Sequence, residues 1–173
     1  MQFIRCTHAE HATAILDIFN DAIENSTALY DYKARTAESM ITWFDAKQAG
    51  NFPVIGVVDE NGTLLAFASY GTFRAWPAFK YSVEHSVYVH KDHRGKGIAP
   101  MLLKKLIEVA TEQQIHTIVG VIDLENEGSI KLHEKLGFTH CGVIKQAGFK
   151  FGKWLDCSFY QLLLNTPQNP VDG

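Results

Sequence analysis

Hydrophobic residues recur at helical spacing in the first part of the chain. From Ala12 to Ile23 the apolar positions fall three and four residues apart, with acidic and amide side chains between them. This period predicts an amphipathic helix with one buried face. Thr7 and Glu10 match a capping box, in which the threonine hydroxyl satisfies a free backbone N–H and the glutamate reaches back to the cap. A second helix is expected over residues 37–49.

Apolar runs rich in β-branched and aromatic residues predict the strands. Two of these runs, 53–58 and 63–70, flank the sequence Asp-Glu-Asn-Gly, which is typical of a hairpin turn. The other expected elements are strands over residues 3–5, 82–89, 117–122, 137–144 and 154–163, and helices over residues 98–110 and 125–135. Antiparallel hairpins first and helix-separated strands later predict one mixed α/β domain over residues 1–164. Residues 165–173 have coil composition, and we expect a frayed tail there.

Composition narrows the classes of protein. The chain has 173 residues, of which 46% are hydrophobic, enough for one domain with a real core. The formal net charge is -3, so the chain lacks the excess of positive charge that nucleic-acid binding requires, and nucleic acid is not an expected partner. No apolar run is long enough to cross a bilayer, so no membrane partner is expected either. Three cysteines without a CxxC pair indicate thiols in a reducing cytoplasm.

Eight histidines raise the question of a metal site. None of them lies in an HExxH motif or at the Cys/His spacing that metal chemistry uses. We therefore expect no metal.

A candidate phosphate site lies where the strand ending at Val89 is followed by a glycine-rich turn and a long helix. The turn and the helix start read Arg94-Gly95-Lys96-Gly97-Ile98-Ala99. Backbone N–H groups point outward at a helix start, the helix dipole adds positive potential, and glycines allow close approach of a phosphate. Arg94 and Lys96 add positive charge. The alternative is that Gly95 and Gly97 only form a tight strand-to-helix turn.

A second constellation follows on the helix predicted after Leu124. If Asn126 caps this helix, then Asn126, Ser129 and His133 project along one polar stripe. The plain alternative is a capped amphipathic helix with an exposed histidine.

Together these segments resemble the GNAT superfamily of N-acetyltransferases. Arg94, Gly97 and Ala99 occupy positions of its R-x-x-G-x-[GA] motif, and the stripe matches N-x-x-[AS]-x-x-L-[YH]-E-x-x-G-F. The resemblance implies a GNAT fold, with a mixed, mostly antiparallel central sheet, flanking helices and acetyl-CoA as co-substrate. It implies that the cofactor contacts two sets of residues, around the turn and along the later helix: Val87, Tyr88, Val89, Arg94, Gly95, Lys96, Gly97, Ile98 and Ala99, together with Asn126, Ser129 and His133.

His133 stands where most members of the superfamily carry tyrosine. The resemblance implies a candidate acid for the leaving thiolate at this position. Histidine titrates near neutrality, so His133 either serves as that acid or only contacts the cofactor.

Further segments look like the phosphinothricin acetyltransferase subfamily. They are residues 18–23, 26–30, 76–79, 83–89, 132–134 and 147–156. The resemblance implies acetylation of the α-amine of phosphinothricin, methionine sulfoximine, methionine sulfone or a similar amino acid, and a homodimer.

Glu84 is the candidate general base, because an α-ammonium group must lose a proton before its nitrogen attacks a thioester. It lies on the strand before the turn, on the same pleat face as Ser82 and Ser86. A partly desolvated carboxylate there accepts that proton directly or through water. The matching glutamate of the subfamily is held to be its base. The alternative is a solvated strand glutamate.

The acceptor site is expected around the aromatic loop. Arg74 suits a bidentate contact with the substrate carboxylate, and Tyr30, Trp76 and Phe79 suit the walls of a small pocket. The alternatives are a surface arginine and ordinary packing of loop aromatics.

No residue is expected to be an acyl-enzyme nucleophile. Cys141 and Cys157 lie in apolar strands without an evident base, and we expect both to be buried thiols. Direct attack in a ternary complex follows, with backbone N–H groups of residues 87–89 binding the oxyanion. Two other functions remain open: a GNAT enzyme acting on another amine, such as a protein N-terminus, a lysine or a polyamine, and a non-catalytic acyl-CoA sensor.

Overall fold

The elements of the computed structural model, which describes all residues 1–173, follow the predicted order. They are β1 (Gln2–Arg5), α1 (His8–Asn25), α2 (Ala37–Ala49), β2 (Val54–Val58), β3 (Leu64–Thr72), β4 (Ser82–Val89), α3 (Ile98–Glu112), β5 (Thr117–Asp123), α4 (Glu127–Lys135), β6 (Thr139–Lys150) and β7 (Lys153–Leu163). Two short 3-10 helices, Pro77–Phe79 and Lys91–His93, flank β4. No helix combines the length and apolar character that crossing a membrane requires.

The strands form one mixed sheet of seven strands in the order β1-β2-β3-β4-β5-β7-β6. β4 pairs with β5 in parallel, whereas β1 with β2, β2 with β3, β5 with β7 and β6 with β7 are antiparallel. This is the mixed, mostly antiparallel sheet that the sequence predicts. By its internal contacts the chain divides into two units, Met1–Tyr70 with Ser86–Leu106, and Gly71–His85 with Ile107–Gly173. β4 contributes to both.

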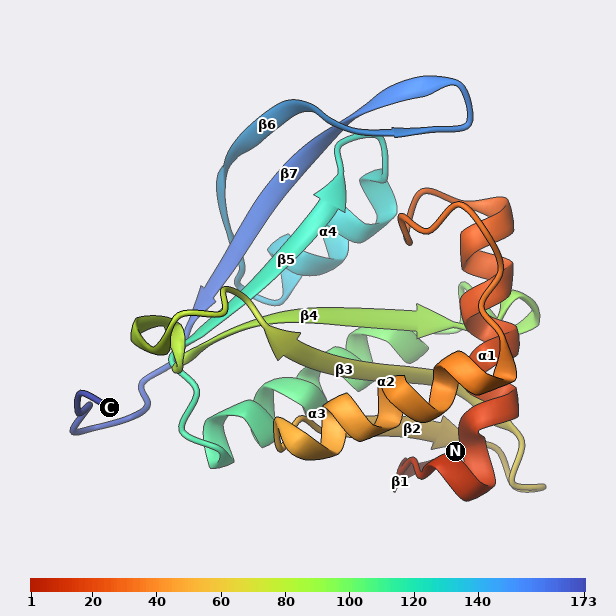
Figure 1. Ribbon diagram of the computed structural model, residues 1–173, viewed down its shortest axis with the longest axis horizontal. Helices are drawn as coiled ribbons and strands as arrows, with labels where there is room; N and C mark the ends of the chain where they lie inside the picture. Colours follow the sequence, from red (N-terminus) through yellow and green to blue (C-terminus); the bar gives the residue numbers. More distant parts are fainter. The chain divides into compact units, whose positions relative to one another are not determined.

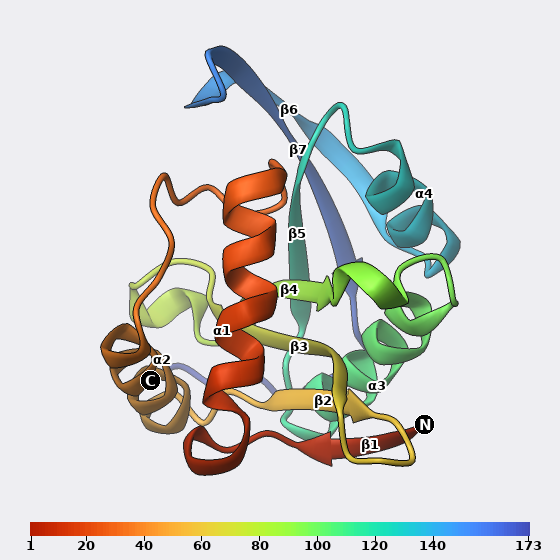
Figure 2. The same cartoon turned by 90° about the vertical axis from the view of Figure 1, so that its right-hand side faces the viewer.

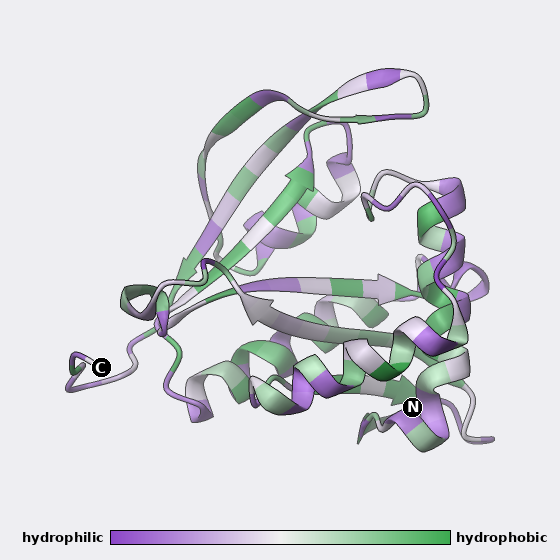
Figure 3. Ribbon diagram, in the orientation of Figure 1, coloured by the Kyte–Doolittle hydropathy of each residue, from purple (hydrophilic) through white to green (hydrophobic).

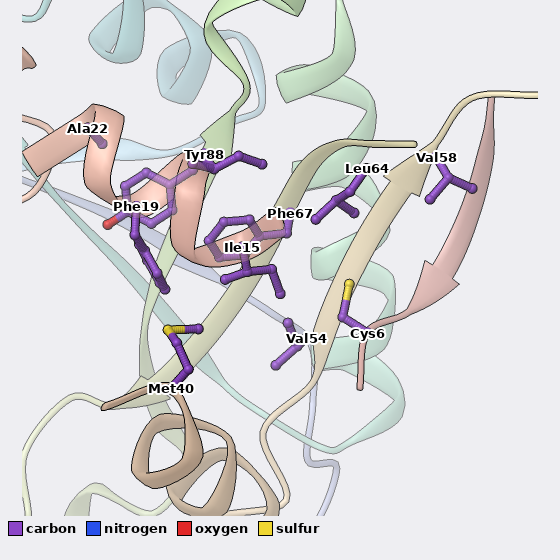
Figure 4. Packing of buried hydrophobic residues seen from close by; sticks show 11 residues of the cluster. Cys6, Ile15, Phe19, Ala22, Met40, Val54, Val58, Leu64, Phe67 and Tyr88 are labelled. Atoms are coloured by element: carbon purple, nitrogen blue, oxygen red, sulfur yellow. The ribbon is translucent and has the colours of Figure 1, made fainter. Parts of the chain in front are cut away.

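The first unit is held by an aromatic core between its helices and its strands. Figures 1 and 2 show α1 and α2 on one face of β1–β3 and the start of α3 on the opposite face. Phe67 of β3 is fully buried, and its ring lies against those of Phe19 on α1 and Tyr88 on β4, at centroid distances of 4.9 and 5.5 Å. Figure 4 shows these rings close to Ile15, with Met40 in the same cluster. This core fixes the end of β4 that leads to the glycine-rich turn.

The second unit is built on β5, β7 and β6, with α4 against β5 and β6 (Figure 2). Hydrophobic and hydrophilic residues are interleaved along these strands (Figure 3). β6 is the outer strand, and almost all of its residues are exposed or half-buried. Its position at the edge explains why Cys141 is exposed, so the expectation of a buried thiol there is wrong. Cys157, on the neighbouring β7, is buried as expected.

The capping box and the tail differ in how far they match the expectation. The Thr7 hydroxyl accepts from the Glu10 N–H at 3.3 Å and donates to the Glu10 carboxylate at 3.2 Å, so the glutamate reaches back to the cap as predicted, while the Thr7 N–H donates to Nδ1 of His11 at 3.0 Å. The tail after Leu164 has no helix or strand. It is not frayed at Thr166, whose hydroxyl donates to the Ile115 carbonyl at 2.5 Å.

Candidate active site

The glycine-rich turn has the backbone that a phosphate site requires. Gly95 and Gly97 both have φ of 75°, in the left-handed region that glycine adopts without strain. A Cβ added at either position would have no neighbour within 4 Å, so the turn is open around both glycines. α3 begins directly afterwards at Ile98, which places the positive end of a fifteen-residue helix at the turn. These features fit the pyrophosphate of a nucleotide-like cofactor.

The two cations of the turn are already engaged with the protein. A terminal nitrogen of Arg94 lies 2.5 Å from a carboxylate oxygen of Asp21 on α1, and Nζ of Lys96 donates to the carbonyl of Asp92 at 3.0 Å. Arg94 therefore links the turn to α1, and its charge is partly offset by Asp21. This ion pair joins residues 73 positions apart and was not predicted from the sequence. An anion at the turn would therefore be held mainly by the backbone N–H groups and the helix dipole.

The Gly97→Ala change tests this role of the turn. Forcing a side chain into the left-handed region costs about 1–2 kcal/mol, so we expect the bound conformation of the turn to be lost and KM for acetyl-CoA to rise about tenfold. Gly62→Ala is the matched control, because Gly62 has φ of 82° and is equally open, but lies in the β2–β3 turn. Steady-state kinetics should show no change in KM for the control. Equal KM values for both variants would contradict a cofactor role.

Glu84 occupies the face of β4 that the alternation predicted. Val83 and His85 are buried, whereas Glu84 between them is exposed. Although water reaches the carboxylate, neighbouring protein removes part of its hydration, and this desolvation raises the pKa of Glu84. The pairing of β4 with β5 ends at Glu84, opposite Val119. A carboxylate with a raised pKa beside open solvent suits a general base.

The polar stripe on α4 forms as the sequence predicted. The Asn126 side chain accepts from the backbone N–H of Ser129 at 3.1 Å and so caps the helix. The Ser129 hydroxyl lies 3.5 Å from Nδ1 of His133, which confirms that these residues follow one another along one side of α4. His133 itself is 4% exposed, so the alternative of a solvent-exposed histidine is wrong.

His133 has a partner that the sequence did not reveal. Its Nδ1 lies 2.7 Å from the carbonyl oxygen of Ser129, and its Nε2 lies 2.9 Å from Nε2 of His85. The two ring planes are inclined by 28° with centroids 5.0 Å apart, so the imidazoles meet edge to edge through these two nitrogens. Burial lowers the pKa of His133, and the hydrogen bond to Ser129 opposes this shift. Burial and then the neighbouring His133 lower the pKa of His85.

The aromatic loop gathers three of the four expected acceptor residues. The Arg74 guanidinium lies 5.0 Å from the ring centroid of Trp76 and 5.5 Å from that of Phe79, within the range of cation–π contacts. All three side chains are exposed. Tyr30 is also exposed but belongs to the first unit, in the segment between α1 and α2.

That segment is fastened to α1 by Asn20, a residue that the sequence did not single out for this role. Its side chain accepts from the backbone N–H of Arg35 at 2.7 Å and donates to the Arg35 carbonyl at 3.1 Å. The Arg35 guanidinium in turn lies 4.2 Å above the Phe19 ring. The hydrogen bonds between Asn20 and Arg35 thus hold the end of the loop that carries Tyr30 against α1.

A family model described as the acetyltransferase (GNAT) family matches residues 14–138. The chain belongs to this family. Its matched region begins within α1 and ends after α4, so it contains both the glycine-rich turn and the polar stripe.

Relatives of this GNAT chain act on amino acids. An L-methionine sulfoximine/L-methionine sulfone acetyltransferase of Pseudomonas paraeruginosa is 44% identical, over 87% of this chain and 88% of that protein. A phosphinothricin N-acetyltransferase of Streptomyces viridochromogenes is 32% identical, over 96% of this chain and 90% of that protein.

Solved structures agree in fold. A protein of Acinetobacter baylyi ADP1 described as an acetyltransferase is 59% identical, with a TM-score of 0.99 over 99% of this chain and 96% of that one. YncA from Salmonella typhimurium, solved with its cofactor acetyl-CoA, is 37% identical, with a TM-score of 0.93 over 99% and 98%. The GNAT fold and acetyl-CoA as co-substrate, both predicted from the sequence, are thereby confirmed.

Proposed function

We propose that this GNAT enzyme transfers the acetyl group of acetyl-CoA to the α-amine of an amino acid such as methionine sulfoximine, methionine sulfone or phosphinothricin. The observation that carries the proposal is Glu84, a carboxylate with a raised pKa on the strand that leads directly to the glycine-rich turn. The names of the relatives support the same class of acceptor.

Glu84 acts as the general base. It takes one proton from the α-ammonium group, directly or through a water molecule, and so frees the nitrogen lone pair for attack on the thioester carbon. Its exposure lets substrate or water reach the carboxylate, and its raised pKa strengthens it as a proton acceptor. No covalent acyl-enzyme is required: the exposed Cys141 contacts the Thr139 carbonyl and the Gln161 side-chain amide, and neither group is a base that would activate its thiol.

The donor is held by both cofactor elements. Backbone N–H groups from Arg94 to Ala99 bind the pyrophosphate, and the Asn126–Ser129–His133 side of α4 contacts the pantetheine arm. Backbone N–H groups of Val87, Tyr88 and Val89, beyond the last β4–β5 pair at Glu84, bind the thioester oxygen as it gains negative charge. The thiolate then leaves as the amide bond forms.

The acceptor is oriented by Arg74 and the exposed aromatic rings. Arg74 binds the substrate carboxylate in a bidentate contact, while Trp76 and Phe79 hold its guanidinium plane. Tyr30 contributes to the wall around the side chain of the amino acid. Such a site excludes amines that lack a carboxylate.

Replacing Arg74 with alanine is expected to raise KM for the amino acid about 10- to 100-fold, because one charge-assisted contact contributes about 1.5–3 kcal/mol. KM for acetyl-CoA should stay unchanged. Arg74→Lys is the matched variant: it keeps the charge but loses the planar fork, so an intermediate KM is expected. Steady-state kinetics, with the amino acid and acetyl-CoA varied in turn, provides both KM values. An equal rise in KM for the amino acid and for acetyl-CoA would contradict a carboxylate-binding role.

A substrate panel separates this function from its rivals. Free thiol release is measured with acetyl-CoA and, in turn, the three amino acids, a peptide with a free N-terminus, a lysine-containing peptide and a polyamine. We expect turnover with the amino acids alone. Turnover with a peptide or a polyamine alone would assign a different amine, and binding of acetyl-CoA without turnover would assign a sensor.

We further propose that the enzyme is a homodimer of the cytoplasm. The β6–β7 hairpin supports a contact between copies, because β6 is a sheet edge and the hairpin exposes Ile144, Phe151 and Trp154 by 55, 58 and 60%. Three free cysteines suit a reducing compartment. Light scattering of the purified chain distinguishes a dimer from a monomer, and a monomer at micromolar concentration would contradict the assembly.

A further inference from the structure

His85 and His133 form a buried pair within the second unit of the fold. They lie on β4 and α4, 48 residues apart, and are 8% and 4% exposed. The rings of Phe138 and Tyr160 enclose His133 at centroid distances of 5.0 and 6.2 Å. The strand alternation turns His85 away from the face that carries Glu84, so the pair is separate from the proposed base.

The hydrogen bonds of His133 define where its proton lies. The carbonyl of Ser129 can only accept, so Nδ1 of His133 carries a hydrogen and donates to it. In a neutral ring the other nitrogen, Nε2, is then an acceptor. The Nε2 atom of His85 must therefore donate across the 2.9 Å contact.

This assignment also accounts for the remaining nitrogen of the pair. With the hydrogen on Nε2 of His85, the Nδ1 atom of that ring carries a lone pair and no hydrogen. This Nδ1 atom is buried without a hydrogen-bond partner. The opposite tautomer would bury an unpaired N–H there and would protonate His133 at both nitrogens. Burial disfavours that charged form, so both rings are neutral and share one N–H···N bond.

Gly120 of β5 leaves room for this arrangement. A Cβ at Gly120 of β5 would lie 3.0 Å from Nε2 of His133 and 3.1 Å from Nε2 of His85. Any larger residue at position 120 would press against both bonded atoms. Glycine at position 120 therefore leaves the space that the two imidazole rings occupy.

We infer that His85 is a positioning residue: it holds the His133 ring neutral and fixed in the wall that α4 presents to the acyl donor. This inference rests on the proposed function, which places α4 at the cofactor. It assigns His133 the role of a cofactor contact rather than that of the acid for the thiolate. Both ring nitrogens of His133 are committed to protein partners, and neither has a proton aimed at the sulfur.

A consequence concerns the pH dependence of turnover. If His133 were the acid, kcat would fall as pH rises through its pKa, which is lowered by burial. A neutral pair predicts no fall of kcat with rising pH, in the acidic range or near neutrality. The other titratable groups near the two rings are Tyr160, whose ring faces His133, Glu134, which accepts from the Tyr160 hydroxyl at 3.5 Å, and His140, whose ring lies 5.1 Å from that of Tyr160.

Two variants of His85 separate positioning from mere packing. His85→Gln keeps an N–H donor of similar reach, whereas His85→Phe fills the site with an apolar ring and leaves Nε2 of His133 without a partner. We expect kcat to stay near the wild-type value in the first variant and to fall about tenfold in the second, with KM for the amino acid unchanged in both. If burial alone mattered, kcat of the His85→Phe variant would equal or exceed that of the His85→Gln variant. Either result would overturn the inference.

The bond itself is measured without reference to catalysis. In the ¹⁵N-labelled wild-type protein, a scalar coupling between the Nε2 nuclei of His85 and His133 is expected across the N–H···N bond. Its absence, with both rings assigned, would overturn the inference even if a variant failed to fold. If the wild type acetylates no amine but shows the coupling, the proposed function fails and the pair stands.

Discussion

Replacing Glu84 with glutamine is expected to lower kcat by about 100-fold or more, the usual contribution of a positioned general base. Glutamine keeps the size and hydrogen-bonding reach of the side chain but accepts no proton from the α-ammonium group. KM for acetyl-CoA should remain unchanged, since the donor is held by the glycine-rich turn and α4. Stopped-assay kinetics with methionine sulfone as acceptor provides both constants.

The pH profile gives the same prediction a second readout. Glu84 is active as the carboxylate, so the wild-type kcat/KM should fall as pH falls through its pKa, which desolvation raises above the ordinary glutamate value. The glutamine variant should lose this acidic limb. Glu60→Gln, an exposed change in the β2–β3 turn, is the matched control and should retain full activity and the limb. Near-wild-type turnover of the Glu84 variant would contradict its role.

The largest expected loss of stability comes from Phe67→Ala. Phe67 is fully buried, and the rings of Phe19, Tyr88 and Trp43 lie within 6.2 Å of its centroid. Removing it leaves a cavity that these stiff rings cannot fill, at a cost of about 3–5 kcal/mol in the free energy of unfolding. For a chain of this length Tm should fall by about 10 °C.

Thermal and denaturant unfolding measure this loss. Tyr32→Ala serves as the control, because this aromatic residue is 74% exposed and its removal should change stability by less than about 0.5 kcal/mol. A loss below about 1 kcal/mol for the Phe67 variant would mean that the core collapses onto the vacated space. The aromatic core would then hold the end of β4 less rigidly than the ring contacts indicate.

The local signals in the sequence predicted much of the fold. The helical period of α1, the capping threonine and asparagine, and the alternation around Glu84 all act between close neighbours in the chain, so they can be identified without knowing tertiary contacts. β6 was expected to end at residue 144 but continues to Lys150. Its last part contains a register shift between Ile144 and Gly148 and polar residues, a composition typical of turns.

The contacts that complete the site were not predictable in the same way. His85 with His133 and Asp21 with Arg94 are separated by 48 and 73 residues. Each of these side chains alone suits an exposed surface equally well, and only the tertiary fold brings the partners together. The sequence therefore predicted the glycine-rich turn and the cap of α4, but not the side-chain contacts that orient Arg94 and His133.

The most direct test of acetyl transfer to an amino-acid α-amine is to identify the product. Purified enzyme is incubated with acetyl-CoA and methionine sulfone, and the product is analysed by mass spectrometry and NMR alongside the released thiol. One acetyl group on the α-nitrogen, formed in equal amount with free CoA and abolished in the Glu84→Gln variant, is the predicted result. Free CoA without any acetylated amino acid, or acetylation of a different amine only, would contradict it.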